Sequence, residues 1–136
     1  MRLMEASCQC GRLQAQVADE ARPFTILCHC TDCQRRTGSP FGVIGYFPSD
    51  AVTISGEARE FCRDTYAGNR LTNGFCPSCG STIYVLLSKN SDMIGVPAGA
   101  FTTPHFSPPV ISVWEQDRHD WVALPETVAR HEKGTD

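Results

Sequence analysis

The sequence contains no long apolar segment. No run within its 136 residues approaches the roughly 18 consecutive apolar residues that a membrane-spanning helix requires. The first ten residues carry Arg2 and Glu5 and have no apolar core of the kind found in secretory signal peptides. These absences predict a cytoplasmic location and no membrane partner. In a reducing cytosol, cysteines are more plausible as metal ligands or nucleophiles than as a disulfide framework.

An excess of positive charge, internal repeats and low-complexity segments are also missing. With 12 Lys and Arg against 15 Asp and Glu, the net charge is −3. The chain as a whole therefore does not attract nucleic acid, although a local patch such as Arg35–Arg36 could act at short range. The 11 Gly and 9 Pro are scattered and leave little room for long helices. A chain of this length predicts a single domain over residues 1–136.

Short alternating or apolar runs between turn residues predict a mainly β fold. The expected strands span residues 13–17, 24–27, 41–47, 82–87 and 110–114. Between Thr31, a candidate N-cap, and Gly38, a candidate C-terminal stop, residues 32–37 are expected to form one or two helical turns. A second short helix is expected over residues 126–133, followed by a frayed tail from Gly134.

Cysteine, by contrast, is abundant, and seven of the eight cysteines fall into three tight clusters. The clusters are Cys8 with Cys10, Cys28 with Cys30 and Cys33, and Cys76 with Cys79. Cysteines separated by one or two residues can close on one tetrahedral ion about 2.3 Å from each sulfur, whereas such close neighbours rarely form a disulfide. The grouping therefore predicts a zinc protein with two sites.

The segment Cys76-Pro77-Ser78-Cys79-Gly80 has the form of a zinc knuckle. Pro77 fixes one backbone angle, and Gly80 permits the turn that points amide groups at the sulfurs. This segment supplies only half of a tetrahedron. Cys8 and Cys10 remain as the other half if the central triplet forms its own site, which predicts a closed structural site that staples most of the chain. The alternative, that these cysteines are small buried hydrophobic residues, is less favoured because paired clusters of this spacing rarely arise by chance.

The central cluster offers three thiolates from one segment. Structural zinc almost always has four protein ligands, whereas catalytic zinc commonly has three and an open position. Cys28, Cys30 and Cys33 are therefore candidate catalytic residues as well as metal ligands. The open position could bind a substrate thiol or polarise a carbonyl oxygen. Cys62 is the candidate fourth ligand if this site is instead closed and structural.

The other titratable side chains give weaker signals. On a strand, Cys62 would share a face with Glu60 and Asp64, so it could be inert or a fourth ligand, whereas Arg63 alone is a weak cause of redox reactivity. His29 lies between two candidate ligands and is expected to point away from the metal, either solvated or bonded behind the ligands, although a ligand or acid–base role remains open. Three other histidines lack a partner at metal-binding spacing: His105, His119 and His131.

The order of these motifs resembles the glutathione-dependent formaldehyde-activating enzyme family, which also includes centromere protein V. Three segments carry the resemblance: Cys8-Gln9-Cys10-Gly11, Cys28-His29-Cys30-Thr31-Asp32-Cys33-Gln34-Arg35 with Gly38, and Gly74-Phe75-Cys76-Pro77-Ser78-Cys79-Gly80-Ser81. It extends from about Cys8 to Trp121, the expected core of the domain. Trp114 and the segment 117–121 add a less specific match.

The resemblance implies a β-tent type of fold with two zinc ions. The structural ion would be held by Cys8, Cys10, Cys76 and Cys79, and the second by the central triplet. The implied reaction joins the glutathione thiol to formaldehyde to give S-hydroxymethylglutathione. The enzyme class, carbon–sulfur lyase, is named for the reverse direction, in which this bond is broken. The implied partners are therefore a small thiol and an aldehyde.

Binding the two carboxylates of glutathione would require positioned cations. The candidates are Arg35, Arg36, Arg63 and Arg70. An apolar wall and a polar group near the open metal site are also expected, with Phe41, Phe47, Phe75 and Ser39 as candidates.

Two other functions remain open. In a scaffolding protein both metals would be structural, Cys62 would complete the second site, and no pocket would be needed. In a redox enzyme such as a methionine sulfoxide reductase, a catalytic cysteine independent of zinc would be needed, and Cys62 is the one available.

Overall fold

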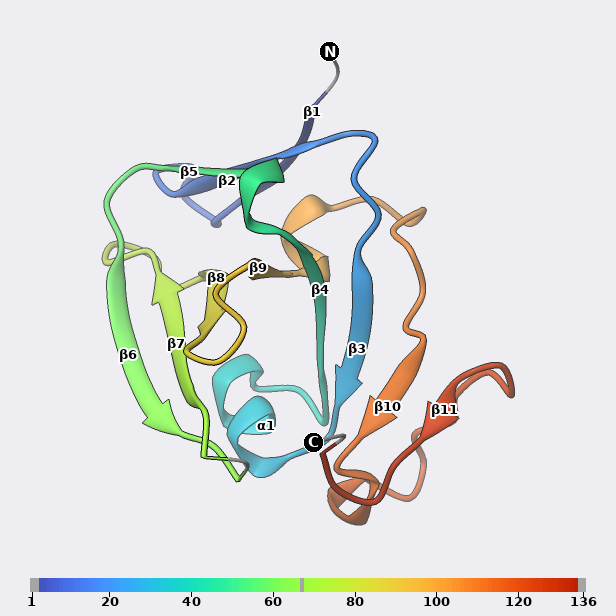
Figure 1. Ribbon diagram of the computed structural model, residues 1–136. Coiled ribbons are helices and arrows are strands. Elements are labelled where there is room, and N and C mark those ends of the chain that lie inside the picture. Colours follow the sequence, from blue (N-terminus) through green and yellow to red (C-terminus); the bar gives the residue numbers. More distant parts are fainter. Residues whose placement is uncertain (1–2, 67, 135–136) are drawn as a thin grey trace.

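Short β-strands dominate the computed structural model, which describes residues 3–66 and 68–134 (Figure 1). The strands are β1 (Leu3–Ser7), β2 (Gln14–Ala18), β3 (Phe24–Cys28), β4 (Gly42–Pro48), β5 (Val52–Ser55), β6 (Arg59–Asp64), β7 (Arg70–Phe75), β8 (Thr82–Leu87), β9 (Met93–Pro97), β10 (Ile111–Val113) and β11 (Ala129–Arg130). The helical segments of these described residues are α1 (Thr31–Thr37) and the 3-10 turns η1 (Ser49–Ala51), η2 (Ala98–Phe101) and η3 (Glu115–Asp117). The predicted mainly β fold is confirmed.

The strands form two sheets. The larger sheet has the order β11-β10-β3-β4-β9-β8-β7-β6, and the smaller has the order β1-β2-β5. Strand β10 runs parallel to both β3 and β11, and the other neighbours pair antiparallel. In Figure 1 the small sheet lies at the top of the molecule, whereas α1 lies at the opposite end, between the β3–β4 and β6–β7 parts of the large sheet.

The core lies where the small sheet packs on the large one. Strand β2 shows how the sequence specifies this, because Ala15 and Val17 are fully buried while Gln14 and Gln16 on the other face remain half-buried. The core cluster draws on both sheets and on η2: Ala6, Cys8, Leu13, Ala15, Val17, Phe47, Cys76, Ile83, Val96 and Phe101. Two of the predicted metal ligands therefore belong to the hydrophobic core.

Helix α1 begins directly after β3 and carries part of the central cysteine cluster. Its N-cap is Cys30, whose sulfur accepts a hydrogen bond from the Cys33 amide, so the prediction of Thr31 as N-cap is wrong by one residue. Its end is as predicted, because Gly38 adopts φ 71° and its amide bonds to Gln34 O at 2.8 Å. The cap places two of the three clustered sulfurs on the first turn of the helix.

The five predicted strands are all present, each end within one residue of its expected position. The helix predicted over residues 126–133 is wrong. Val128 is buried there, and β11 pairs with β10 through bonds from Ala129 N to Val110 O (3.1 Å) and from His131 N to Ser112 O (2.9 Å). Pairing with an existing strand satisfies backbone groups that a short isolated helix would leave exposed. The tail was expected to be frayed from Gly134, and its part after Gly134 lies outside the described residues.

No helix in the described ranges is long and apolar enough to cross a membrane. The domain extent, residues 1–136 with a core of about 8–121, stays a prediction. The cytoplasmic location does too.

Candidate metal centres and active site

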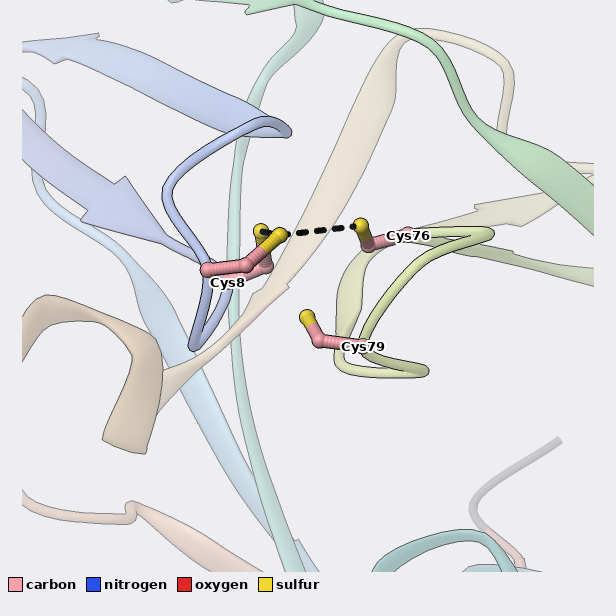
Figure 2. Close-up of side chains that lie close together, drawn as sticks. Cys8, Cys76 and Cys79 are labelled. Carbon is pink, nitrogen blue, oxygen red and sulfur yellow. Dashed lines mark hydrogen bonds between the residues drawn. The ribbon is translucent and has the colours of Figure 1, made fainter.

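Four cysteine sulfurs from two distant loops meet beside the core (Figure 2). Cys8 and Cys10 lie between β1 and β2, and Cys76 and Cys79 lie between β7 and β8. Cys10 Sγ is 3.7 Å from Cys8 Sγ and 3.6 Å from Cys76 Sγ, and all four sulfurs lie within 4.8 Å of one another. A tetrahedral ion with bonds of about 2.3 Å would hold its sulfurs about 3.8 Å apart. These four residues, called here the four-sulfur cluster, therefore fit a zinc-sized ion.

Backbone amides point at this cluster from both loops. The Leu13 amide donates to Cys8 Sγ at 3.2 Å, and the Ser78 amide lies 3.4 Å from Cys76 Sγ. Such donors stabilise negative charge on sulfur, and thiolate is the form that binds a metal. Although burial opposes ionisation, the bond from Leu13 lowers the pKa of the Cys8 thiol.

Each loop of the four-sulfur cluster turns at a glycine. Gly11 and Gly80 both have φ 82°, a left-handed conformation that costs other residues energy. Hydrogen bonds with the Ser81 hydroxyl and amide lower the pKa of Cys79 to about 5. The turn predicted at Gly80 is thus present.

The central cysteines form a second, smaller group, called here the three-sulfur cluster. Cys28 ends β3, Cys30 caps α1 and Cys33 lies in the first turn of the helix. Their sulfurs lie within 4.8 Å of one another. No fourth ligand atom from His, Cys, Asp or Glu completes this group in residues 3–66 or 68–134. The donor set fits a metal with three protein ligands and an open position.

The electrostatics of the three-sulfur cluster also favour a bound cation. Hydrogen bonds from the Cys28 and Cys33 thiols lower the pKa of Cys30 to about 2. For Cys28, contacts with the Cys30 and Cys33 sulfurs, together with burial, strongly raise the pKa. Three thiolates this close repel one another, so all three ionise together only around a positive ion.

The three-sulfur cluster lies on the wall of a cavity of about 690 Å³. All three cysteines line it, and the opposite wall comes from β6, β7 and the turn between them, including Arg63 and Leu71. A cavity of this size is within the range that binds small molecules. The four-sulfur cluster has no residue on this cavity.

The residues predicted to build the pocket are mostly wrong. The candidates Phe41, Phe47, Phe75 and Ser39 do not line the cavity, and Phe47 is fully buried in the core. Of the four candidate arginines only Arg63 lines it, and its Nη1 lies 3.4 Å from Asp32 Oδ2. Strand alternation explains two of these misses, because Phe47 and Arg70 are sequence neighbours of the lining residues Tyr46 and Leu71 and so face the other side of their strands.

The structure decides between the roles that the sequence left open for Cys62 and His29. Cys62 is exposed on β6 with its sulfur 3.1 Å from Thr72 Oγ1, and it does not belong to either sulfur group. The fourth-ligand hypothesis for Cys62 is therefore wrong. His29 does not belong to the sulfur groups either, but it is fully buried, so the solvated alternative is wrong.

Behind the three-sulfur cluster, His29 joins a buried polar network. Its Nε2 lies 2.9 Å from Ser112 Oγ and 3.4 Å from Glu115 Oε2, and the Ser112 hydroxyl donates to Glu115. Arg130 donates from Nε and Nη2 to the two Glu115 oxygens, each at 2.9 Å, and Arg118 Nε lies 3.3 Å from Glu115. This network ties β10, η3 and β11 to the segment that carries the cysteines.

Burial and hydrogen bonds set the charge states of Glu115 and His29 in this network. Burial opposes ionisation of Glu115, but hydrogen bonds from Arg130 and Ser112 lower the pKa of its carboxyl to about 2. Burial lowers the pKa of His29, and the nearby Glu115 carboxylate offsets this in part. The network therefore holds an ionised glutamate beside a largely neutral histidine at pH 7.

Sequence reasoning missed Ser112, Glu115 and Arg130, and also the cavity residue Tyr66. Trp114 was singled out in the sequence, but its place on the cavity was not predicted. Ser112 stands inside an apolar predicted strand, where a buried hydroxyl needs a partner, and that was the one available signal. Nothing in the spacing indicated that Arg130 would reach Glu115, because their pairing depends on β11.

Comparisons with known proteins bear on the family and on the fold. Residues 3–117 match the sequence family described as glutathione-dependent formaldehyde-activating enzyme. No curated protein sequence matches the chain significantly. A crystal structure of a Rhodobacter sphaeroides protein aligns with a TM-score of 0.52 at 19% sequence identity, covering 77% of this chain and 92% of that one, which supports the fold alone. Because the family match spans most of the chain, this protein belongs to the glutathione-dependent formaldehyde-activating enzyme family.

Proposed function

We propose that this protein is a zinc-dependent carbon–sulfur lyase that acts on adducts of a small thiol, such as glutathione, with an aldehyde such as formaldehyde. The observation that carries the proposal is the three-sulfur cluster on the wall of a 690 Å³ cavity, without a fourth ligand among the described residues. A purely structural zinc would be expected to have four protein ligands and no reason to face a cavity. Family membership supports the same thiol and aldehyde chemistry.

In this proposal the two clusters hold different zinc ions. Cys8, Cys10, Cys76 and Cys79 hold a structural ion, and the three-sulfur cluster holds the second, with its open position toward the cavity. When bound there, the ion would supply Lewis-acid stabilisation of negative charge on the substrate oxygen or sulfur.

The reaction needs no redox cofactor. An adduct R–CH(OH)–S–R′ gives R–CHO and R′–SH: the carbon–sulfur bond breaks with its electron pair going to sulfur, and the hydroxyl proton ends on that sulfur. Tyr46 lines the cavity, and burial together with the nearby sulfurs of Cys33 and Cys28 raises the pKa of its hydroxyl. The hydroxyl therefore stays protonated at pH 7 and can donate a hydrogen bond to the substrate oxygen.

Zinc content per chain tests the metal part of the proposal. We expect two zinc ions in anaerobically purified wild type, one in Cys30→Ser and two in Cys62→Ser, measured by mass spectrometry of the metal. Cys62→Ser is the matched control because Cys62 is exposed and outside both sulfur groups. Loss of the second zinc in Cys62→Ser would contradict an open site and favour a scaffolding protein.

Exchange spectroscopy tests the chemical part. In a mixture of formaldehyde, glutathione and their adduct, NMR exchange rates report how fast the carbon–sulfur bond forms and breaks. Wild type and Cys62→Ser should accelerate the exchange, and Cys30→Ser should not. If Cys30→Ser accelerates exchange as well as wild type, the three-sulfur cluster is not the reaction site.

A further inference from the structure

The cavity beside the three-sulfur cluster is lined mainly by apolar and aromatic side chains. Four aromatic residues contribute to it, Phe24, Tyr46, Tyr66 and Trp114, with aliphatic residues that include Ile44 and Leu71. Formaldehyde carries no substituent on its carbonyl carbon and would contact almost none of this surface. The cavity therefore has room and apolar wall for a group that formaldehyde lacks.

The charges on the cavity wall do not match glutathione. Arg63 is the one Lys or Arg among the described lining residues, and it already pairs with Asp32 at 3.4 Å. Asp64 and Asp117 add further negative charge to the wall. Glutathione carries two carboxylates, which would meet three acidic groups on this wall, and the cation of the lining is already paired. Lys133 lies nearby, but its Nζ is 5.5 Å from the centre of the Tyr66 ring and does not line the cavity. An uncharged ligand avoids this cost.

Trp114 is held at the cavity in a conformation that bulky residues rarely adopt. Its backbone has φ 57° and ψ 43°, in the left-handed region. Such strain persists only when surrounding structure enforces it, and it clusters at ligand-binding positions. Here the strand pairing of β10 and the bond from Trp114 N to Lys133 O (3.2 Å) fix the turn. The indole is thereby presented to the cavity.

Tyr66 contacts the same indole and also lines the cavity. It lies in the turn after β6, and its ring meets that of Trp114 edge-on with centroids 5.2 Å apart. Tyr66 nevertheless remains 66% exposed, so much of its side chain stays open to further contact. The two rings thus form one contiguous aromatic surface on the cavity wall.

We propose that the substrate of this enzyme is an adduct whose aldehyde half carries an uncharged aromatic group, packed against Tyr66 and Trp114, and whose thiol half is not an anionic peptide. The inference rests on the proposed lyase function and narrows its substrate class. Cleavage of C6H5–CH(OH)–S–R′ would release benzaldehyde and R′–SH, with the carbon–sulfur electron pair and the hydroxyl proton both going to sulfur.

Binding is tested with two unreactive thioethers that lack the hydroxyl of the adduct. 2-(Benzylthio)ethanol represents the uncharged aromatic substrate, and S-methylglutathione represents the formaldehyde–glutathione adduct. The chain has two tryptophans, so Trp121→Phe leaves Trp114 as the sole fluorescent reporter of the cavity. Trp121 is 71% exposed and does not line the cavity, which makes the change mild.

In this background the benzyl thioether should shift Trp114 fluorescence and bind at least about tenfold more tightly than S-methylglutathione. Adding Tyr66→Ala should weaken the benzyl thioether about tenfold and leave S-methylglutathione unchanged. The matched control is Phe61→Ala, which removes an exposed aromatic residue of β6 that does not line the cavity. Equal or tighter binding of S-methylglutathione overturns the proposal, as does an equal effect of Tyr66→Ala and Phe61→Ala.

Exchange rates separate failure of this inference from failure of the lyase function. The wild-type protein should accelerate exchange of benzaldehyde with 2-mercaptoethanol more than exchange of formaldehyde with glutathione. The reverse order overturns the aromatic substrate and leaves the lyase function standing. Acceleration of neither pair overturns the lyase function and, with it, this substrate assignment, even if the thioether binds.

Discussion

The four-sulfur cluster joins two loops that are far apart in the sequence, whereas the three-sulfur cluster comes entirely from residues 28–33. The first has a complete tetrahedral donor set, with Cys8 and Cys76 in the hydrophobic core. The second lies on a cavity wall and lacks a fourth ligand in the described chain. Closing a long loop restricts the unfolded chain far more than closing a short one. The same residue type therefore forms a closed group beside the core in one place and an open group beside a cavity in the other.

The largest expected effect comes from breaking the four-sulfur cluster. Cys76→Ser removes a ligand from a closed site that connects the β1–β2 and β7–β8 loops, and structural metal binding contributes directly to folding. We expect the free energy of unfolding at saturating zinc to fall by more than about 4 kcal/mol. Chemical denaturation followed by circular dichroism measures this.

Cys30→Ser is the matched change in the other cluster. Its site closes only a short loop, so the expected loss of stability is below about 2 kcal/mol even though the second zinc is lost. Cys62→Ser, on the surface of β6, should change stability by less than about 0.5 kcal/mol. If Cys30→Ser destabilises as much as Cys76→Ser, both clusters are structural and the contrast between them fails.

Local spacing was enough to predict which cysteines come together in each cluster but not their surroundings. The Cys-x-Cys and Cys-x-x-Cys pairs and their glycines are short-range features that can be read from the sequence. As predicted, the structure brings the pair Cys8 and Cys10 together with the pair Cys76 and Cys79. The cavity walls depend on which residues of β4, β6 and β7 face inward after the large sheet has curved around α1. The candidate wall residue Phe47 illustrates the limit, because its strand turns it into the core.

An intermediate effect is expected in the polar network that supports the three-sulfur cluster. Glu115→Gln removes the charge that Arg130 and Ser112 bind, and leaves Arg118 without its carboxylate neighbour. We expect a loss of about 2 kcal/mol at pH 7, since breaking a mostly buried charged network strands its partners. Glu126→Gln, at an exposed acidic position, is the control and should be nearly silent.

The pH dependence of the stability difference between wild type and Glu115→Gln shows whether the charge of Glu115 causes it. The pKa of Glu115 is lowered from 4.5 to about 2 in the folded protein, so its contribution is fully present above about pH 4.5 and is lost as the pH falls toward 2. The gap in melting temperature between wild type and Glu115→Gln should therefore narrow as the pH is lowered below about 4.5. A gap that stays constant with pH would show that the mutation acts through packing and not through charge.

This network also shows why part of the site was invisible in the sequence. The segment around Arg130 was predicted as a helix, but it forms β11 and brings a guanidinium onto Glu115. A two-residue strand has almost no periodicity of its own, and its position depends on the β10 edge that it pairs with. His29 was expected to point away from the metal. Its partner Ser112 could not be predicted, because it lies on β10 and reaches His29 only through the pairing of β10 with β3.

The smallest expected effect concerns the glycines that follow each cluster. Gly80, after the four-sulfur cluster, has φ 82°, and Gly38, after α1, has φ 71°; an added Cβ would meet no atom within 4 Å at either position. Gly80→Ala and Gly38→Ala should therefore each cost about 1 kcal/mol through backbone strain alone. Gly99→Ala also meets open space and has no left-handed backbone, so it should stay within about 0.5 kcal/mol of wild type.

The rate of zinc release to a chelator should distinguish Gly80→Ala from Gly38→Ala, because only Gly80 belongs to a loop of the four-sulfur cluster. The Gly80 amide bonds to Cys76 O at 2.8 Å and shapes the loop whose Ser78 amide faces the Cys76 sulfur, so Gly80→Ala should speed release from the four-sulfur cluster. The Gly38 amide instead bonds to Gln34 O, four residues from its own position and beyond the clustered sulfurs. Gly38→Ala should therefore lose stability without faster release from the four-sulfur cluster. Equal release rates in the two variants would mean that the knuckle turn does not set how tightly this metal is held.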